Sequence, residues 1–495
     1  MIIRPDRRTL FESSRPGAPG YQLPHADSPK PLTEQALPSQ LLRQNKAALP
    51  EVSEIEVVRH FTNLSRRNFG VDLGTYPLGS CTMKYNPKVN EDAAELRGFT
   101  HLHPTQSDED AAGTLELYGK LLECLCELTG MDGGTLQPMA GAHGEFVGMK
   151  IFRAAFRHRG EEQRTRLLVP DSSHGTNPAS AHLAGFEVVT IPSGEDGLLN
   201  PSLLDPYLDE KLAGIMLTNP STLGLFEPQI QEVADKIHGA GGLLYYDGAN
   251  FNAVMGRARP GDMGFDVVHL NVHKTLSTPH GGGGPGAGPV LVGKELLPYL
   301  PLPFIQRTES GWVRDWDRPL SIGKVAQWYG NTGVLIRAYT YVLCMGGEGL
   351  KRATDLAVLN ANYLLHRLKE SYNAPYPAPC KHEFVLNLKG LKDCCGVNAT
   401  DIAKGLIEYG IHPPTVYFPL IVPECLMLEP TETETKESLD HLVQVMEELR
   451  ELADRDPQAL HELPQSSEVR RVDEVRAARH PVLSHQMRHK RPDKD

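Results

Sequence analysis

The sequence predicts an α/β protein with a mostly parallel sheet that helices cover on both faces, followed by a smaller C-terminal α/β domain. The first observation is that short apolar runs alternate with segments of helical periodicity between about residues 110 and 300. The second is that these short runs are mostly apolar, as strands are when both of their faces are buried. Repeated strand–helix units of this kind build a parallel sheet. The third is length, because 495 residues can bury a large core without disulfides or metals.

Six apolar runs are expected to form the strands of the main sheet. They occupy residues 166–170, 186–191, 213–218, 242–247, 267–271 and 289–292. Apolar positions at helical spacing predict helices over 113–129, 145–157 and 229–240. In the smaller domain the pattern predicts one strand, over 384–388, and helices over 331–343, 347–370, 399–408 and 435–452.

Changes in composition divide the chain into four predicted parts. These are an N-terminal arm and motif-rich segment over 1–90, a large domain over 91–325, a small domain over 326–465 and a charged tail over 466–495. About the first 50 residues contain many Pro, Ser and charged residues, a composition that buries too little apolar surface for a core. We expect this stretch to be an extended arm of the kind that wraps a partner subunit.

Composition argues against several classes of protein. The net charge of −12 argues against a broad basic surface for nucleic acid. No run of about 18 apolar residues occurs, and the N-terminus lacks the apolar region of a secretory signal, so we expect neither a membrane span nor export. The eight cysteines are scattered without a CxxC pair. Reduced thiols in a cytoplasmic protein are therefore expected, with no metal site.

Two residues of complementary charge follow predicted strand ends. Asp247 ends the run 242–247, and Lys274 lies just beyond the run 267–271. Side chains at the carboxyl ends of parallel strands face the crevice in which α/β proteins bind ligands. Pyridoxal 5′-phosphate (PLP) chemistry needs such a pair, because a lysine forms a Schiff base with the cofactor and an acid keeps its pyridine nitrogen protonated. A solvated lysine and a turn aspartate are the alternative.

Two further motifs lie at expected strand or helix ends. Gly141-Ala-His-Gly precedes a predicted helix, whose free backbone N–H groups could bind a phosphate, although an ordinary glycine-rich turn fits as well. His174 follows the run 166–170 and could stack on a cofactor ring, although a lone histidine is more often structural.

Two other patterns indicate weaker hypotheses. The glycines at 281, 283 and 286 match GxGxxG, but no strand leads directly into them and no helix follows, so a dinucleotide site is disfavoured. His101 and His103 could suggest a metal, but no third ligand lies at a useful spacing.

Longer strings make the sequence similar to a known family. It resembles the second, lysine-bearing subunit of the P-protein of the glycine cleavage system over about residues 50–480. The strings that carry the resemblance include Val71-Asp-Leu-Gly-Thr-Tyr-Pro-Leu-Gly-Ser-Cys-Thr-Met-Lys-Tyr-Asn-Pro, Gln137-Pro-Met-Ala-Gly-Ala-His-Gly-Glu, Leu217-Thr-Asn-Pro-Ser-Thr-Leu-Gly-Leu-Phe-Glu, Tyr245-Tyr-Asp-Gly-Ala-Asn and Asn271-Val-His-Lys-Thr.

The resemblance implies the type I fold of PLP-dependent enzymes, like that of aspartate aminotransferase. It also implies roles for particular residues. Lys274 matches the Schiff-base lysine, Asp247 the pyridinium partner and His174 the ring-stacking histidine. The remaining cofactor contacts that it implies are Gly141, Ala142 and His143 in a phosphate loop, Thr222 near the phenolic oxygen, and Ala249 and His273.

The implied reaction decarboxylates glycine and passes the remaining aminomethyl group to the lipoyl arm of the H-protein. The chain matches the lysine-bearing half of single-chain P-proteins, so the resemblance implies a separate subunit 1 in an α2β2 heterotetramer, within a complex that includes the T and L proteins. Three alternatives stay open: another PLP-dependent aminotransferase or decarboxylase, a non-enzymatic assembly subunit, and a nucleotide-dependent dehydrogenase.

Overall fold

The computed structural model describes residues 8–22, 24, 37–45, 47–281, 286–376, 379–485 and 487. Chain contacts divide it into two compact units. One comprises residues 71–470, and the other comprises residues 1–70 together with 471–495. The four predicted parts do not coincide with these units, and their boundaries stay a prediction.

A seven-stranded sheet forms the centre of the unit 71–470, and its strand order is β1-β7-β6-β5-β4-β2-β3. Neighbouring strands from β6 to β3 pair in parallel, whereas β7 is antiparallel to both β6 and β1. The strands are β1 (Gly133–Thr135), β2 (Arg166–Pro170), β3 (Glu187–Ile191), β4 (Leu212–Leu217), β5 (Leu243–Gly248), β6 (Val267–Leu270) and β7 (Val290–Val292).

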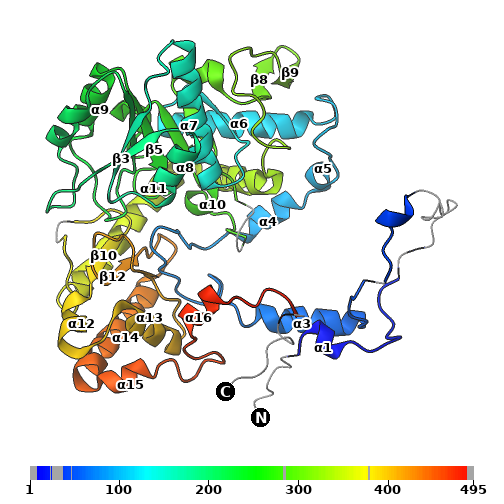
Figure 1. Cartoon of the computed structure of the whole chain (residues 1–495), viewed down its shortest axis with the longest axis vertical. Coiled ribbons are helices and arrows are strands. Elements are labelled where there is room, and N and C mark those ends of the chain that lie inside the picture. Colours follow the sequence, from blue (N-terminus) through cyan, green and yellow to red (C-terminus); the bar gives the residue numbers. More distant parts are fainter. Residues whose placement is uncertain are drawn as a thin grey trace. The chain divides into compact units, whose positions relative to one another are not determined.

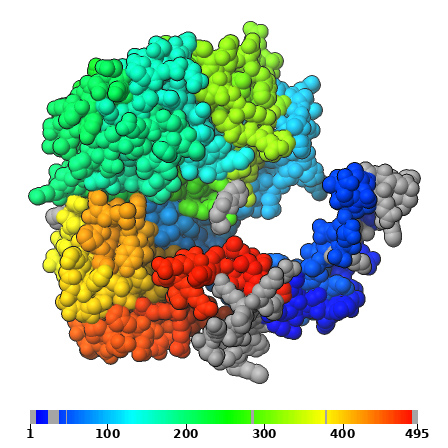
Figure 2. Space-filling model, viewed as in Figure 1, coloured from blue at the N-terminus to red at the C-terminus, as the bar shows by residue number. Residues whose placement is uncertain are grey.

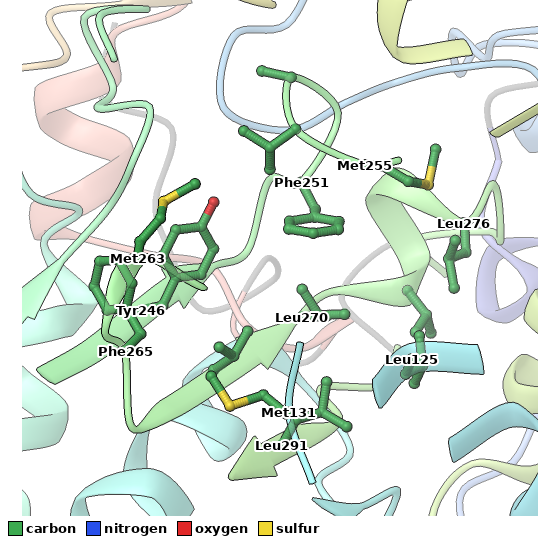
Figure 3. Close-up of a cluster of buried hydrophobic side chains, with 14 of the residues drawn as sticks. Leu125, Met131, Tyr246, Phe251, Met255, Met263, Phe265, Leu270, Leu276 and Leu291 are labelled. Atoms are coloured by element: carbon green, nitrogen blue, oxygen red, sulfur yellow. The ribbon is translucent and has the colours of Figure 1, made fainter. Parts of the chain in front are cut away.

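Helices cover both faces of this sheet, as the sequence predicts (Figure 1). Consecutive strand residues point to opposite faces, and β5 shows the result. Tyr245 packs against Phe152 of α7, with ring centroids 6.4 Å apart, while Tyr246 packs against Phe265 at 4.9 Å on the other face. Figure 3 shows Tyr246 and Phe265 in the second of these apolar clusters. The covering helices are α6 (Ala112–Thr129), α7 (Gly141–His158), α8 (Thr176–Leu183), α9 (Ile230–Gly239) and part of α11 (Thr332–Leu368).

A smaller α/β layer follows the sheet in the sequence. Its antiparallel sheet has the order β10-β12-β11, and Figure 2 shows its residues (yellow to orange) as one continuous packed body. The predicted helices 331–343 and 347–370 are the two arms of α11, which Gly346 separates with φ 58° and ψ 176°. The other elements are β10 (Phe384–Asn387), β11 (Thr415–Val416), β12 (Cys425–Leu428), α12 (Lys389–Cys395), α13 (Ala399–Glu408), α14 (Lys436–Arg455) and α15 (Pro457–His461).

Short elements complete the unit 71–470. They are α4 (Lys88–Ala94), α5 (Arg97–Thr100), η2 (Pro201–Tyr207), η3 (Pro260–Met263), α10 (Val272–Thr275), η4 (Lys294–Tyr299) and the hairpin of β8 (Phe304–Thr308) and β9 (Gly311–Asp315). The second unit contains α1 (Leu10–Ser13), η1 (Ser39–Leu41), α3 (Glu54–Ser65) and α16 (Glu474–Arg479). Within it Phe11 stacks on His485, with ring centroids 4.7 Å apart, so the predicted arm and tail contact each other.

The structure confirms all six predicted strands of the main sheet to within about two residues and adds two features. The sequence analysis missed β1, which has only three residues. It also did not foresee that β7 runs antiparallel. A parallel return needs a crossover connection, usually a helix, and the only helix between β6 and β7 in the described residues is the four-residue α10.

Two expectations drawn from the composition concern the cysteines and membrane-spanning helices. All eight cysteines are free thiols. None of the helices in the described ranges combines the length and the apolar character that crossing a bilayer requires.

We predict that Gly148→Ala destabilises the protein by about 1–3 kcal/mol, because α7 lies tightly against β5 at this position. A Cβ at Gly148 would overlap the Tyr245 ring and lie 3.2 Å from Val267 Cγ1. The control is Gly113→Ala in α6, where a Cβ meets nothing within 4 Å and should be neutral or stabilising by up to about 1 kcal/mol. Urea midpoints of the two variants measure the difference, and equal midpoints would contradict this packing.

Candidate active site

The parallel pairing of β5 and β6 brings Asp247 and Lys274 to one edge of the sheet. Asp247 pairs in register with His269 of β6, and Lys274 lies one short turn further on, in α10. Lys274 is half-buried, and its Nζ donates a hydrogen bond to the Ser80 carbonyl oxygen at 2.5 Å. The structure therefore confirms the prediction that these two residues lie at the same edge of the sheet.

Asp247 is buried, with 2% of its surface exposed, and its carboxylate has several partners. Asn177 Nδ2 donates to Oδ2 at 2.8 Å, and the Ala249 N–H donates to Oδ1 at 3.0 Å. His269 Nε2 lies 3.5 Å from Oδ1. Burial alone would raise the pKa of Asp247, but His269 and these two donors outweigh it and hold the pKa below its ordinary value. The structure thus keeps a carboxylate charged in the protein interior.

A cavity of about 140 Å³ joins these groups and contains seven of the nine predicted site residues. The seven are Gly141, Ala142, His174, Thr222, Asp247, Ala249 and Lys274. Sequence reasoning missed the other lining residues, which are Ser80, Glu145, Thr176, Thr218, Pro220, Asn250, Asn271, His382 and Glu383.

The N-terminus of α7 forms one wall of the cavity. The helix begins at Gly141, and its Ala140 N-cap makes no side-chain hydrogen bond. The first N–H groups of a helix have no partner within it and favour an anion. A Cβ at Gly141 would lie 2.6 Å from the Asn271 amide atoms, so glycine is required for this approach.

Three other predicted residues line the cavity in different ways. His174 Nδ1 lies 2.9 Å from the Thr176 hydroxyl, and the surrounding protein atoms lower the pKa of His174 although its ring stays exposed. The Thr222 hydroxyl is buried and donates to the Ser172 carbonyl oxygen at 2.6 Å. Ala249 contributes the N–H that binds Asp247.

Two predicted residues, His143 and His273, do not line this cavity. His143 Nδ1 accepts from the Met139 N–H at 3.2 Å, so the ring is turned back over the turn before α7. His273 Nδ1 lies 3.3 Å from the Ala287 nitrogen, and burial lowers the pKa of His273 to about 3. Their expected cofactor contacts stay predictions. Gly283 of the GxGxxG match lies outside the described residues.

Glu145 is a titratable group that the sequence analysis quoted in a motif without assigning it a role. Its buried carboxyl accepts from the Thr176 hydroxyl at 2.7 Å and from the Ser180 hydroxyl at 2.9 Å. Burial, reinforced by the charge of Asp247, raises the pKa of Glu145 to about 7. The acidic residue four positions after the helix start in Gly141-Ala-His-Gly-Glu was the available signal.

A second acidic group comes from the smaller layer. His382, Glu383 and Glu429 are buried, and one ligand atom from each lies within 4.8 Å of the others, a grouping that could hold a metal ion. However, the Glu429 oxygens already accept from Thr82, Asn250 and Asn252. Donors that point at the Glu429 carboxylate compete with a cation for its oxygens.

Known proteins resemble this chain along nearly its whole length. A probable glycine dehydrogenase (decarboxylating) subunit 2 from Caldanaerobacter subterraneus subsp. tengcongensis is 56% identical over 475 residues, which cover 96% of this chain and 98% of that protein. The protein of the same description from Bacillus velezensis is 54% identical over 481 residues, with 97% and 98% covered. The family model for the glycine dehydrogenase C-terminal domain matches residues 353–466.

Solved structures share the architecture. The inhibitor-bound glycine decarboxylase (P-protein) of the glycine cleavage system superposes with a TM-score of 0.71 at 21% identity, covering 84% of this chain and 93% of that one. The Escherichia coli cysteine desulfurase CsdA gives a TM-score of 0.59 at 16% identity, with 77% and 96% covered. The fold is the type I fold of PLP-dependent enzymes, as the sequence resemblance implied. Because identity of 54–56% extends over nearly the full length of both chains, this chain belongs to the family of glycine dehydrogenase (decarboxylating) subunit 2 enzymes.

Proposed function

We propose that this chain decarboxylates glycine with PLP and passes the aminomethyl group to the lipoyl arm of the H-protein, as subunit 2 of the glycine cleavage P-protein. The observation that carries the proposal is one cavity that contains the Lys274 amine, the buried Asp247 carboxylate and the start of α7. The chain is similar over nearly its full length to proteins described as glycine dehydrogenase (decarboxylating) subunit 2, and this similarity supports glycine as the substrate.

The residues of the cavity fit PLP. The cofactor has an aldehyde, a ring nitrogen and a phosphate, and the cavity offers an amine, a carboxylate and a helix N-terminus. Two lining residues also have buried polar atoms without a partner, Thr218 Oγ1 and Asn271 Oδ1. Such atoms cost free energy unless a ligand satisfies them. Lys274 would hold the aldehyde carbon, Asp247 the ring nitrogen and the Gly141 end of α7 the phosphate.

PLP, when bound, supplies the ring that accepts the electron pair left behind as carbon dioxide departs. The chain's own residues prepare that event. Asp247 keeps a negative charge in a buried place, where an ion pair with a protonated ring nitrogen is stronger than in water. Lys274 presents its amine at the edge of the same sheet, and His174 lies at the cavity wall, where it can cover the ring.

The proposal includes partners. The description "subunit 2" of the similar proteins supports a separate subunit 1, and we propose an α2β2 heterotetramer that works with the H-, T- and L-proteins. The expected cytoplasmic location stays a prediction.

We expect borohydride reduction followed by peptide mapping to place the pyridoxyl group on Lys274, because its amine reaches the cavity. Lys84 is the matched control. Lys84 is buried rather than half-buried, and its Nζ is held by Glu432 at 2.6 Å and by the Thr275 carbonyl oxygen at 2.7 Å. A label on Lys84, or on any lysine other than Lys274, would contradict the assignment.

We predict that Asp247→Asn still binds PLP but decarboxylates glycine more slowly by roughly 10²-fold or more, because a preorganised charge is lost while the shape is kept. Cofactor absorbance and glycine–bicarbonate exchange in the presence of H-protein measure the two effects separately. Asp110→Asn, on the exposed surface, should leave both unchanged. Near-normal turnover in Asp247→Asn would show that this carboxylate is structural only.

We expect the chain without a second, different subunit to be nearly inactive in glycine decarboxylation with H-protein. The composition of the arm indicates a segment that a partner orders. The test compares the purified, PLP-saturated chain with the same chain after addition of subunit 1. Cofactor binding should change less than aminomethyl transfer. Full activity in a pure homo-oligomer would rule out the heteromeric proposal.

A further inference from the structure

A strained turn over residues 79–82 touches the lysine of the site. Ser80 has φ 64° and Thr82 has φ 46°, in the left-handed region that side chains other than glycine rarely adopt. For a β-branched threonine this conformation is a true outlier, and it persists only where surrounding contacts impose it. The turn is anchored to β12 by the Leu78–Leu428 bridge, and in Figures 1 and 2 its chain (blue) lies beside that layer.

The backbone of Ser80 forms hydrogen bonds with both Lys274 and Glu383. Its carbonyl oxygen accepts from Lys274 Nζ at 2.5 Å, and its N–H donates to Glu383 Oε2 at 2.7 Å. Ser80 and Glu383 both line the cavity that contains Lys274. The position of the acceptor for the lysine amine therefore depends on the Glu383 side chain.

Glu429 holds the other end of the same turn. Its carboxylate accepts from the Thr82 N–H at 3.1 Å and from the Thr82 hydroxyl at 2.6 Å. The side-chain amides of Asn250 and Asn252 donate to it as well, at distances between 2.8 and 3.0 Å. Glu429 thus has four donor groups, whereas the only hydrogen bond described for Glu383 is the one from Ser80.

The scarcity of donors and the nearby Glu429 carboxyl group both bear on the pKa of Glu383. Two buried carboxylates this close cannot both ionise easily. Burial, reinforced by Glu429, raises the pKa of Glu383 well above its ordinary value, although Ser80 and Lys274 oppose the shift. The other groups facing Glu383 are His382, whose Nε2 lies 3.5 Å from Oε1, and the thiols of Cys81, Cys380 and Cys425. Glu383 is therefore shifted toward its protonated, neutral form.

We propose that Glu383 is a positioning residue for Lys274, which it controls by fixing the Ser80 peptide so that the Ser80 carbonyl holds the lysine amine whenever that amine is free. The proposal rests on the proposed role of Lys274 in the cofactor site. A lysine that is released from the cofactor when substrate binds needs a hydrogen-bond acceptor that holds its free amine close to the reacting atoms. The Ser80 carbonyl supplies it, and Glu383 supports it without adding a charge to the cavity.

The test uses the full-length chain in the oligomer in which it is purified, with three variants. Glu383→Gln retains a neutral acceptor for the Ser80 N–H, Glu383→Ala removes the acceptor, and Glu451→Ala on the exposed surface of α14 is the control. Three quantities are measured: the rate of PLP incorporation into cofactor-free protein, the pKa of the Lys274 Schiff base by absorbance, and hydrogen exchange of residues 78–84.

We expect Glu383→Ala to slow PLP incorporation by about tenfold or more and to speed exchange in the turn, because a mobile Ser80 no longer presents the amine. Glu383→Gln should behave like the wild type in all three measurements, since one neutral group replaces another. The Schiff base is a cation, so removing a negative charge beside it would instead lower its pKa, by about one unit or more.

Three results overturn the proposal. Wild-type behaviour in Glu383→Ala means that the Ser80 turn does not depend on Glu383. A lowered Schiff-base pKa in Glu383→Gln means that Glu383 is charged. If borohydride does not label Lys274 in the wild-type protein, both this inference and the proposed function fail, whereas a labelled Lys274 with either of the first two results removes only this inference.

Discussion

Asp247 is a carboxylate in the protein interior, and much of the site is arranged so that it can stay charged there. An unpaired buried charge is costly, so β5 ends where three polar neighbours converge. Asn177 arrives from α8, His269 from the adjacent β6 and the Ala249 N–H from the turn after β5. The parallel register that brings His269 beside Asp247 also brings Lys274 to the same edge. The two groups proposed for cofactor chemistry thus depend on one strand pairing.

The same physical solution occurs twice around the cavity. In each of two acidic pairs, burial and a neighbouring carboxyl group push one member toward its protonated form. Asp247 and Glu145 form one pair, and burial beside Asp247 raises the pKa of Glu145 to about 7. Glu429 and Glu383 form the other pair. Environments that drive paired pKa values apart favour different protonation states for neighbouring carboxyl groups, so the cavity places two carboxyl groups of raised pKa, Glu145 and Glu383, near the Asp247 carboxylate.

Sequence reasoning located the main features of the fold because they are local. Strands such as 289–292 are continuous apolar runs, and the start of α7 is marked by small residues, so patterns within about ten residues reveal them. The direction of β7 was missed because pairing direction depends on what crosses over between strands. Ser80 and Glu383 were missed as site residues because 303 residues separate them in the chain and no local pattern connects them.

By itself the sequence determined the alternation of strands and helices, the strand ends that carry Asp247 and Lys274, and the glycine that opens α7. These follow from short-range periodicity and from the rule that parallel strands present their carboxyl ends at one edge. Only the tertiary structure decided that the turn at Ser80 reaches Lys274, that His143 and His273 do not line the cavity, and which carboxyl groups have raised pKa values. Those outcomes depend on burial and on donors from distant segments, and both quantities exist only once the chain is packed.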